Sequence, residues 1–370
     1  MIGALLAIET SCDETAAAIL AETGDAARPW TILANVVASQ TAIHREWGGV
    51  VPELASRQHV RDICGVVEEA LARAGLRSAD LDAVAVTQGP GLVGSLLVGV
   101  AFAKSFAMSL GLPVVPVHHL AGHIESLTLA HGELPMPAAV LVVSGGHTSL
   151  YFVAEPGRYQ LIGRTRDDAA GEAYDKVAKL LGLGYPGGPA IDRAARDGDE
   201  RAYAFPAARL THADRNAPNP TAPHGLLPAE IARRVDFSFS GLKTAVLRLV
   251  RETAGASASG EAVALTPQQV ADISASFQRV VVNALLDRTF EAARWLGARS
   301  IGIAGGVSAN TRLRAEAEAR ATKFGIPVFV PPIALSTDNA SMIGAAALRQ
   351  LQLGETGRRL DFNAEASLAL

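Results

Sequence analysis

The chain has 370 residues, of which 49% are hydrophobic and 19% charged, and its formal net charge is −4 at pH 7. This length favours two lobes over a single core, and the composition excludes extended disorder and suits an α/β protein whose sheet is buried on both faces. The net negative charge excludes a basic surface spread over the whole molecule, so contact with nucleic acid needs a local patch or a partner.

The first predicted unit is a hairpin over residues 4–20, where two apolar strands flank a small polar turn. Asp13 and Glu14 lie at this turn. Carboxylates at such a corner can position a water, a nucleophile or a magnesium ion beside a phosphate. As turn residues they need no function at all, and both interpretations stay open.

A helix is predicted over residues 48–75 from its spacing of apolar positions. The uncharged run at 83–103 reaches the length of a membrane span, but a Gly/Pro turn within it predicts a strand followed by a buried helix. We therefore expect no membrane span. The chain contains only two cysteines, which favours a reducing compartment, and we expect a cytoplasmic protein.

Three histidines crowd into residues 117–123, at a predicted passage from strand to helix. His119 and His123 are four residues apart, so a helix presents them on one face, as helices present two ligands to one metal. Two partly buried histidines held by hydrogen bonds are the alternative. His118 lies off that face and is predicted to be structural. Metalloprotease chemistry is disfavoured because Leu120, not a glutamate, follows the first ligand.

A second strand-turn-strand unit spans residues 138–155, with Ser144, Gly145 and Gly146 at its turn. Its likeness to the first hairpin suggests a duplicated fold with one phosphate loop in each lobe. Glycines after a strand let backbone N–H groups approach an anion, although a plain tight turn explains them equally well. The common dinucleotide and P-loop fingerprints are absent from the sequence.

Acidic residues surround another Gly/Pro turn in residues 167–192, namely Glu172, Asp175 and Asp192. Near a nucleotide such carboxylates accept from ribose hydroxyls or hold a cation, and solvated helix charges are the alternative. The segment 201–232 is rich in Ala, Pro, His and Asn, and we expect an insertion or exposed loop there.

The last third begins with a strand, a Gly-rich turn, a helix and a strand over residues 299–332, which form a βαβ unit with Asn310 near the helix start. Asp338 follows at a turn before an apolar helix. It is either an N-cap or a distant third metal ligand. A His/His/Asp set suits zinc and ferrous iron equally.

Several motifs together resemble those of the tRNA N6-adenosine threonylcarbamoyltransferase family, the bacterial TsaD proteins. They include ETSCDET, VHHLAGH, VSGGHTSL, AGGVSANTRLR and STDNASMIG, and the match runs in order from Leu5 to Ala347. The resemblance implies an α/β fold of the actin-like, sugar-kinase-like and Hsp70-like ATPase class (ASKHA), with two lobes and a nucleotide cleft. We expect one lobe from residues 1–118 plus about 340–370, and the other from 119–339.

By motif match, the resemblance implies one Fe²⁺ or Zn²⁺ held by His119, His123 and Asp338. It implies threonylcarbamoyl-AMP or ATP as the nucleotide, with Mg²⁺ as a further candidate. Asp13 or Glu14 are candidates for assisting proton removal. The nucleotide contacts implied are Val142, Val143, Ser144, Gly145, Gly146, Asp175, Gly188, Asp192 and Asn310.

The activity implied is transfer of a threonylcarbamoyl group from threonylcarbamoyl-AMP to N6 of the adenosine 3′-adjacent to the anticodon, in tRNAs reading ANN codons, with release of AMP. The implied partners are tRNA, a TsaB-like paralogue and a TsaE-like ATPase. A small-molecule kinase or ATPase of the same fold is the main alternative, and it has no need of His119, His123 and Asp338. A non-catalytic scaffold is a further alternative, although such a protein is expected to lose these histidines.

Overall fold

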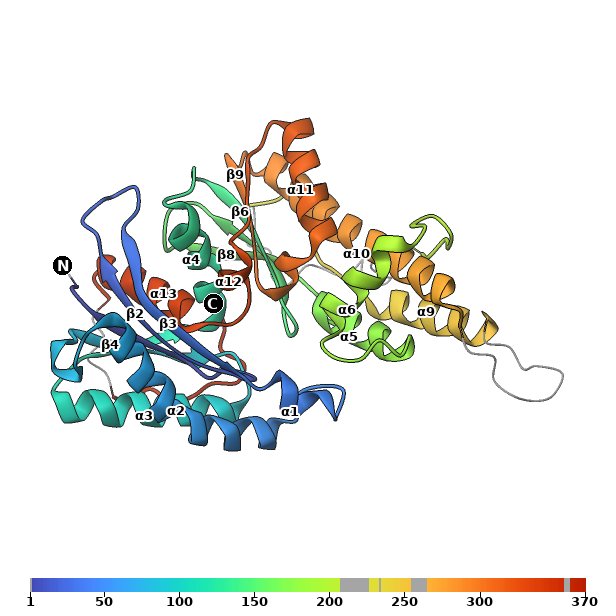
Figure 1. The fold of residues 1–370 in the computed structure, drawn as a ribbon. Coiled ribbons are helices and arrows are strands. Elements are labelled where there is room, and N and C mark those ends of the chain that lie inside the picture. Colours follow the sequence, from blue (N-terminus) through green and yellow to red (C-terminus); the bar gives the residue numbers. More distant parts are fainter. Residues whose placement is uncertain (1, 207–225, 233, 254–264, 356–359) are drawn as a thin grey trace. The chain divides into compact units, whose positions relative to one another are not determined.

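The computed structural model describes residues 2–206, 226–232, 234–253, 265–355 and 360–370 (Figure 1). Residues 207–225, most of the expected insertion at 201–232, lie outside this part. The chain divides into two compact units, which are taken separately below. The first comprises Met1–Met136, Val153–Tyr159 and Pro331–Leu370, and the second comprises Pro137–Phe152 and Gln160–Val330.

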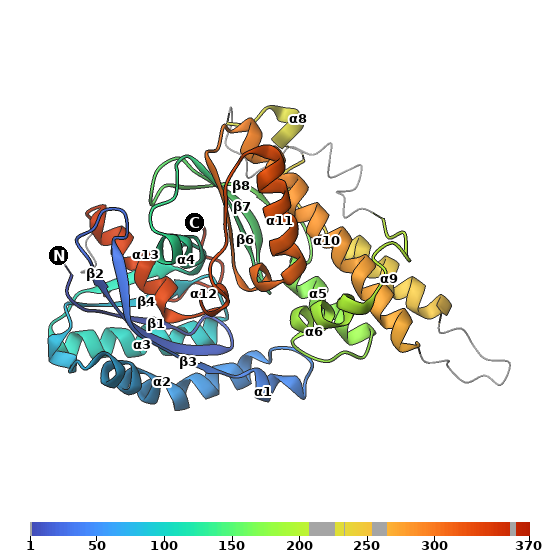
Figure 2. The same ribbon diagram turned by 45° about the horizontal axis from the view of Figure 1, so that its top comes forward.

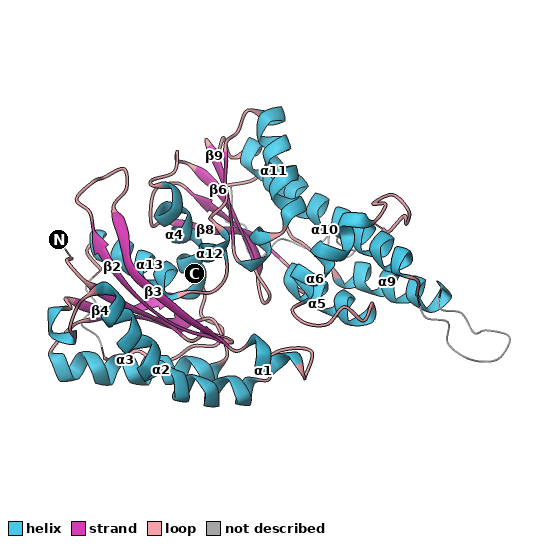
Figure 3. Ribbon diagram, in the orientation of Figure 1, coloured by secondary structure: helices cyan, strands magenta, loops and turns pink. Residues whose placement is uncertain are grey.

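Strands and helices alternate along much of the chain (Figure 3). The strands are β1 (Leu5–Glu9), β2 (Glu14–Glu22), β3 (Trp30–Ser39), β4 (Ala83–Gly89), β5 (Val114–His118), β6 (Ala138–Val143), β7 (Thr148–Val153), β8 (Tyr159–Arg164), β9 (Ser300–Ala304) and β10 (Val328–Phe329). The α-helices are α1 (Thr41–Arg45), α2 (Pro52–Ala74), α3 (Val93–Leu110), α4 (His119–His131), α5 (Ala170–Leu180), α6 (Gly187–Ala194), α8 (Ala229–Ala232), α9 (Ser240–Thr253), α10 (Pro267–Trp295), α11 (Thr311–Phe324), α12 (Ile333–Ser336) and α13 (Ala340–Gln352).

The sheet of the first unit has the strand order β3-β2-β1-β4-β5. β1 and β2 pair antiparallel, which confirms the predicted first hairpin, and β4 and β5 run parallel to β1 and to each other. Successive side chains of a strand face opposite sides of a sheet, so an apolar strand contributes side chains to the hydrophobic cores on both sides. Leu5 packs in one core with α4 and α13, and Leu6 in the other with α2 and α3.

The sheet of the second unit has the order β10-β9-β6-β7-β8. Counted along each unit, both sheets therefore place the first strand centrally, the second and third on one side, and the fourth and fifth on the other. β6, β9 and β10 are parallel, as the predicted βαβ unit requires. Figure 2 shows α10 and α11 alongside this sheet. The repeated order confirms the predicted duplication.

The N-terminal segment of the first unit ends at Met136, whereas the sequence predicted a boundary at residue 118. Its C-terminal segment begins at Pro331, whereas about 340 was predicted. The reason is that α4 packs on α13. A side chain added at Gly122 of α4 would lie 3.0 Å from Ile343 Cδ1 and 3.2 Å from Met342 Cγ, so the two helices are in close contact. The predicted metal ligands His119, His123 and Asp338 consequently all belong to one unit.

Among the described helices, α3 is long and apolar enough, by length and composition alone, to cross a membrane. Its predicted separation from β4 by a turn is confirmed. The prediction that α3 is buried is wrong for one of its faces: Val100 and Ala103 pack against α2 and the sheet, whereas Val93, Leu97 and Met108 are exposed. One side of α3 covers the sheet, and only that side is buried within the unit.

Candidate metal centre

The site is built around the first turn of α4. His118, the last residue of β5, caps this helix: its Nδ1 accepts from Leu120 N at 3.1 Å, while its Nε2 donates to the carbonyl oxygen of Leu368 at 3.1 Å. One ring nitrogen accepts and the other donates, so the ring is neutral. Burial lowers the pKa of His118 to about 4, in agreement with this state. The histidine serves the backbone, as the sequence predicted.

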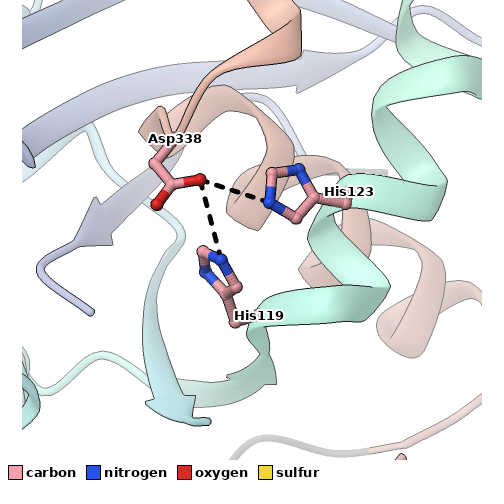
Figure 4. A group of neighbouring side chains, drawn as sticks. All are labelled: His119, His123 and Asp338. Atoms are coloured by element: carbon pink, nitrogen blue, oxygen red, sulfur yellow. Dashed lines mark ion pairs between the residues drawn. The ribbon is translucent and has the colours of Figure 1, made fainter. Parts of the chain in front are cut away.

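His119 and His123 lie one turn apart on α4 and point toward Asp338 (Figure 4). Asp338 Oδ1 is 3.2 Å from His123 Nε2 and 3.7 Å from His119 Nε2. The three ligand atoms all lie within 4.8 Å of one another. Both imidazoles are buried, whereas the Asp338 side chain keeps 21% of its surface exposed. The structure therefore brings together the three residues that the sequence named as ligands.

The 3.2 Å between His123 Nε2 and Asp338 Oδ1 is the spacing of two ligands on one divalent ion, whereas the 3.7 Å between His119 Nε2 and Asp338 Oδ1 is longer. Around a tetrahedral zinc with ligands at about 2.0 Å, neighbouring ligand atoms lie roughly 3.3 Å apart. His123 is fully buried, yet neither of its ring nitrogens makes a hydrogen bond within the described residues. Its Nε2 has the Asp338 carboxylate 3.2 Å away as an ion-pair partner, and an ion bound between the two would give both atoms a ligand contact. Two imidazoles and a carboxylate are ligands that zinc and ferrous iron both accept.

Asp338 does not cap the following helix. Asn339 performs that role, since its Oδ1 accepts from Met342 N at 3.2 Å. The alternative interpretation of Asp338 as an N-cap is therefore wrong. The adjacent asparagine leaves the aspartate side chain available to face the histidines, and α13 itself packs on α4 at this point.

Glu9, which contacts the far side of the His119 ring, is not among the residues predicted from the sequence. Glu9 ends β1 fully buried, and its Oε2 lies 3.0 Å from His119 Nδ1, with Ser11 Oγ at 3.2 Å from the same nitrogen. Burial opposes a charge on His119, but the Asp338 and Glu9 carboxylates outweigh burial and raise its pKa to about 9. A signal for Glu9 existed in the sequence: it is an acidic residue directly after the apolar strand residues 5–8.

Asp13 and Glu14 lie at the β1–β2 turn in the same unit. Burial raises the pKa of Glu14 well above its ordinary value, and the charges of Asp13 and Asp338 raise it further. His59 of α2 stabilises this turn, because its Nε2 donates a hydrogen bond to the Cys12 carbonyl oxygen at 2.9 Å. A part for Asp13 or Glu14 in proton transfer stays a prediction.

The predicted nucleotide residues all belong to the second unit. Ser144–Gly146 form the turn between β6 and β7, closed by a 2.8 Å hydrogen bond from Ser144 N to the His147 carbonyl oxygen. A side chain at Gly145 or Gly146 would meet nothing within 4 Å. By contrast, a Cβ at Gly171, in the first turn of α5, would lie 2.5 Å from Ser144 O. The turn therefore has open space on one side and α5 close against it on the other.

Asp192 and Asn310 meet in a buried network. Asp192 Oδ1 accepts from Asn310 Nδ2 at 3.2 Å and from Thr311 Oγ1 at 2.9 Å. Asn310 also caps α11, accepting from Leu313 N at 2.9 Å. A solvated helix charge is thus the wrong interpretation for Asp192, whereas Glu172 is partly exposed and pairs with Lys176 at 2.7 Å, as a surface charge does.

Two further predicted nucleotide residues, Asp175 of α5 and Gly188 of α6, lie where the middle of α5 meets the start of α6. Asp175 Oδ1 accepts from Gly187 N at 2.7 Å, and Gly188, the next residue, has open space where a side chain would stand. A Cβ at Gly187 would lie 2.5 Å from Asp175 Cα, so glycine is required for this approach. Contact of these residues with a nucleotide stays a prediction.

Two α/β units with the same strand order make a duplicated fold, which is the fold of the actin-like ATPase class. Solved structures of this class resemble the chain. Component A of (R)-2-hydroxyglutaryl-CoA dehydratase from Acidaminococcus fermentans has a TM-score of 0.50 and 13% identity, covering 95% of this chain and 99% of that one. Full-length HypF in its phosphate- and nucleotide-bound form has a TM-score of 0.54 and 13% identity, covering 95% and 55%.

Sequence comparison is more specific. The family model of TsaD, tRNA N6-adenosine threonylcarbamoyltransferase, matches residues 31–345. Proteins of that name from Moorella thermoacetica and Anaeromyxobacter dehalogenans strain 2CP-C are each 51% identical, covering 94% and 99% of this chain and 91% and 99% of their own. The chain belongs to the tRNA N6-adenosine threonylcarbamoyltransferase family.

Proposed function

We propose that this protein transfers the threonylcarbamoyl group from threonylcarbamoyl-AMP to N6 of the adenosine 3′-adjacent to the anticodon, in tRNAs that read ANN codons. Family membership over nearly the whole chain supports the reaction. The convergence of His119, His123 and Asp338 carries the proposal, because a small-molecule kinase of the same fold has no use for these ligands. That alternative is not favoured by the relatives.

The chemistry explains why the site needs more than positioning. The exocyclic amine of adenine is a poor nucleophile, since its lone pair is delocalised into the ring. In the transfer, N6 bonds to the carbamoyl carbon, the bond from that carbon to the phosphate oxygen breaks, AMP leaves with the electron pair, and N6 loses a proton. An Fe²⁺ or Zn²⁺ held by His119, His123 and Asp338 would offset negative charge that develops on the donor's oxygens.

The remaining steps fall to the chain's own groups. Because Ser144 N–H is bonded to the His147 carbonyl oxygen, the backbone N–H groups of Gly145 and Gly146 in this turn are the ones that suit the phosphate of the adenylate, with or without Mg²⁺. The other predicted nucleotide residues would hold its ribose and base. Asp13 or Glu14 would take the proton from N6. Burial raises the pKa of Glu14, so its ionised form is a stronger base than an ordinary carboxylate.

We infer that tRNA binding and turnover in the cytoplasm involve a TsaB-like paralogue and a TsaE-like ATPase. The net charge of −4 supports this, because an acidic chain repels tRNA, and a positively charged partner surface would increase the affinity of the assembly for tRNA. The exposed apolar side chains Val93, Leu97 and Met108 of α3 give a protein partner a surface to cover.

The direct test is a transfer assay with synthetic threonylcarbamoyl-AMP and unmodified tRNA, with and without the partner proteins. Modified nucleoside is expected with the intact chain, to be lost after chelation, and to return with iron or zinc. His123→Ala should abolish it, whereas His131→Ala, at the exposed end of the same helix, should not. Formation of modified nucleoside at the normal rate by His123→Ala would contradict the proposal.

A further inference from the structure

The position of Glu9 is unusual for a carboxylate. It ends the central strand β1 and has no exposed surface. A buried carboxylate is costly unless it is hydrogen-bonded. Here the backbone N–H of Ser11 donates to Oε1, Thr87 Oγ1 donates to Oε2 at 2.8 Å, and His119 Nδ1 lies 3.0 Å from Oε2. The fold thus surrounds Glu9 with donors, one of which belongs to a candidate metal ligand.

This contact selects the tautomer of His119. An ionised carboxylate only accepts hydrogen bonds, so the proton shared with Glu9 must be on Nδ1. When His119 binds an ion it gives up the proton on Nε2 and keeps the one on Nδ1, so Nε2, the nitrogen that faces Asp338 Oδ1 at 3.7 Å, is the ligand atom. Metal-binding histidines commonly donate their second ring N–H to a carboxylate, which fixes the ring and makes it a better ligand.

Thr87 in turn fixes Glu9. Thr87 lies in β4, the parallel neighbour of β1, and is fully buried. Its hydroxyl reaches the same oxygen, Oε2, that meets His119. The hydroxyl of Thr87 therefore fixes the position of the Glu9 carboxylate, and the carboxylate in turn fixes the orientation of the His119 imidazole on α4.

We propose that Glu9 is a positioning residue of the metal centre, with Thr87 as its support: the Glu9 carboxylate keeps His119 protonated on Nδ1 and turns Nε2 toward the ion. This inference rests on the metal site of the proposed function. It also makes the two histidines unequal, since Nδ1 of His123 has no hydrogen-bond partner within the described residues. Loss of Glu9 therefore weakens the site through His119 alone.

The test is the affinity of the metal-free full-length protein for Zn²⁺, measured by competition with a chromophoric chelator. Glu9→Gln should weaken binding by about 10- to 100-fold, the usual effect of losing a carboxylate behind a ligating histidine. Thr87→Val, which keeps the carboxylate, should weaken it less. The matched control, Glu68→Gln on the exposed side of α2, should bind as the unaltered chain does. Wild-type affinity in a folded Glu9→Gln protein would overturn the inference.

Two further measurements keep the outcomes distinct. In the Zn²⁺-loaded protein, ¹⁵N NMR should show His119 protonated on Nδ1 and coordinated through Nε2, and coordination through Nδ1 would refute the role of Glu9. If Glu9→Gln does not fold, the decision falls to Thr87→Val, and unchanged affinity there also refutes it. If His123→Ala binds Zn²⁺ normally, the metal site itself fails, and the proposed function fails with it.

Discussion

The histidines of the candidate site differ in the groups that their ring nitrogens contact. His123 is buried without a hydrogen bond in the described chain, whereas His118 uses both ring nitrogens to hold backbone groups. Of these two histidines from one short segment, His118 stabilises the backbone and His123 is a candidate metal ligand. The difference arises because one imidazole faces Asp338 and the other faces the carbonyl oxygen of Leu368.

Metal removal should lower the stability of the protein. An ion that binds only the folded state stabilises it by about 2.7 kcal/mol at one hundred times its dissociation constant. Zn²⁺ should therefore raise the midpoint of urea unfolding of the chelated protein, and should not do so for His123→Ala. His131→Ala is the matched control and should respond like the unaltered chain. An equal rise in midpoint for His123→Ala would place the ion elsewhere.

Acid should weaken the hold of His59 on the β1–β2 turn. Burial lowers the pKa of His59 below 6.5, so the folded chain favours its neutral form, which donates to Cys12 O and accepts from Thr15 Oγ1 at 2.8 Å. This stabilisation is complete above pH 6.5 and is lost as the pH falls through the lower folded pKa. His59→Gln should cost about 1–3 kcal/mol at pH 7.5.

Urea unfolding of both proteins between pH 8 and pH 5 measures this effect. The difference in free energy of unfolding between the unaltered chain and His59→Gln should shrink as the pH falls. A difference that stays constant or grows on acidification would show that the charge state of His59 is not linked to folding.

At the scale of elements, the metal centre depends on how α4 lies against α13. Arg349 of α13 pairs with Glu125 of α4 at 3.3 Å and with Glu133 at 2.6 Å, and its guanidinium lies 4.7 Å from the Trp30 ring. Tyr159 donates to Glu125 Oε1 at 2.5 Å. This buried network joins the helix that carries the histidines to the helix that follows Asp338.

Arg349→Met should destabilise the protein by about 3–5 kcal/mol, because it leaves the buried Glu125 carboxylate without its cation. Arg57→Met is the matched control: its pair with Glu53 is exposed, and its loss should cost less than about 1 kcal/mol. Urea unfolding measures both. Adding Glu125→Gln to Arg349→Met should recover part of the loss, and a cost for Arg349→Met no larger than that for Arg57→Met would contradict the account.

The Gly-rich turn after β9 offers a second element-scale test. Gly305 has φ +91°, and an added Cβ would lie 2.4 Å from Val143 O, whereas a Cβ at Gly306 would meet nothing within 4 Å. Gly305→Ala should cost at least about 1–3 kcal/mol through backbone strain and the clash with β6. Gly306→Ala should change the free energy of unfolding by less than about 0.5 kcal/mol. Equal effects in thermal unfolding would contradict this.

At the scale of the whole molecule, the charge of the chain bears on how it meets tRNA. With a net charge of −4, the chain alone should bind tRNA no more tightly than the nonspecific range, a Kd of about 10⁻⁴ to 10⁻⁶ M at physiological salt. Adding a TsaB-like partner should tighten binding and steepen its salt dependence. Filter binding at several salt concentrations measures both, and tight tRNA binding by the isolated chain would contradict the expectation.

Local sequence patterns were enough to predict the strands, the helices and the kinds of ligand. Alternating apolar strands and glycine turns predicted both hairpins, the βαβ unit and the duplication, because these patterns follow from local backbone geometry. The helical spacing of His119 and His123 predicted a shared face for the same reason. The motifs that resemble the family named Asp338, some two hundred residues further along the chain.

Which side chains contact one another follows from the way the elements pack in three dimensions. Sequence patterns report local periodicity, and they carry no information on which distant strand or helix lies next to a given side chain. Glu9 lies next to His119 because β1 is central in its sheet and α4 follows β5, which only β4 separates from β1. Asn339, not Asp338, caps α13. The first unit likewise includes α4, which the predicted boundary at residue 118 excluded, because α4 packs on α13, a contact between segments far apart in the sequence.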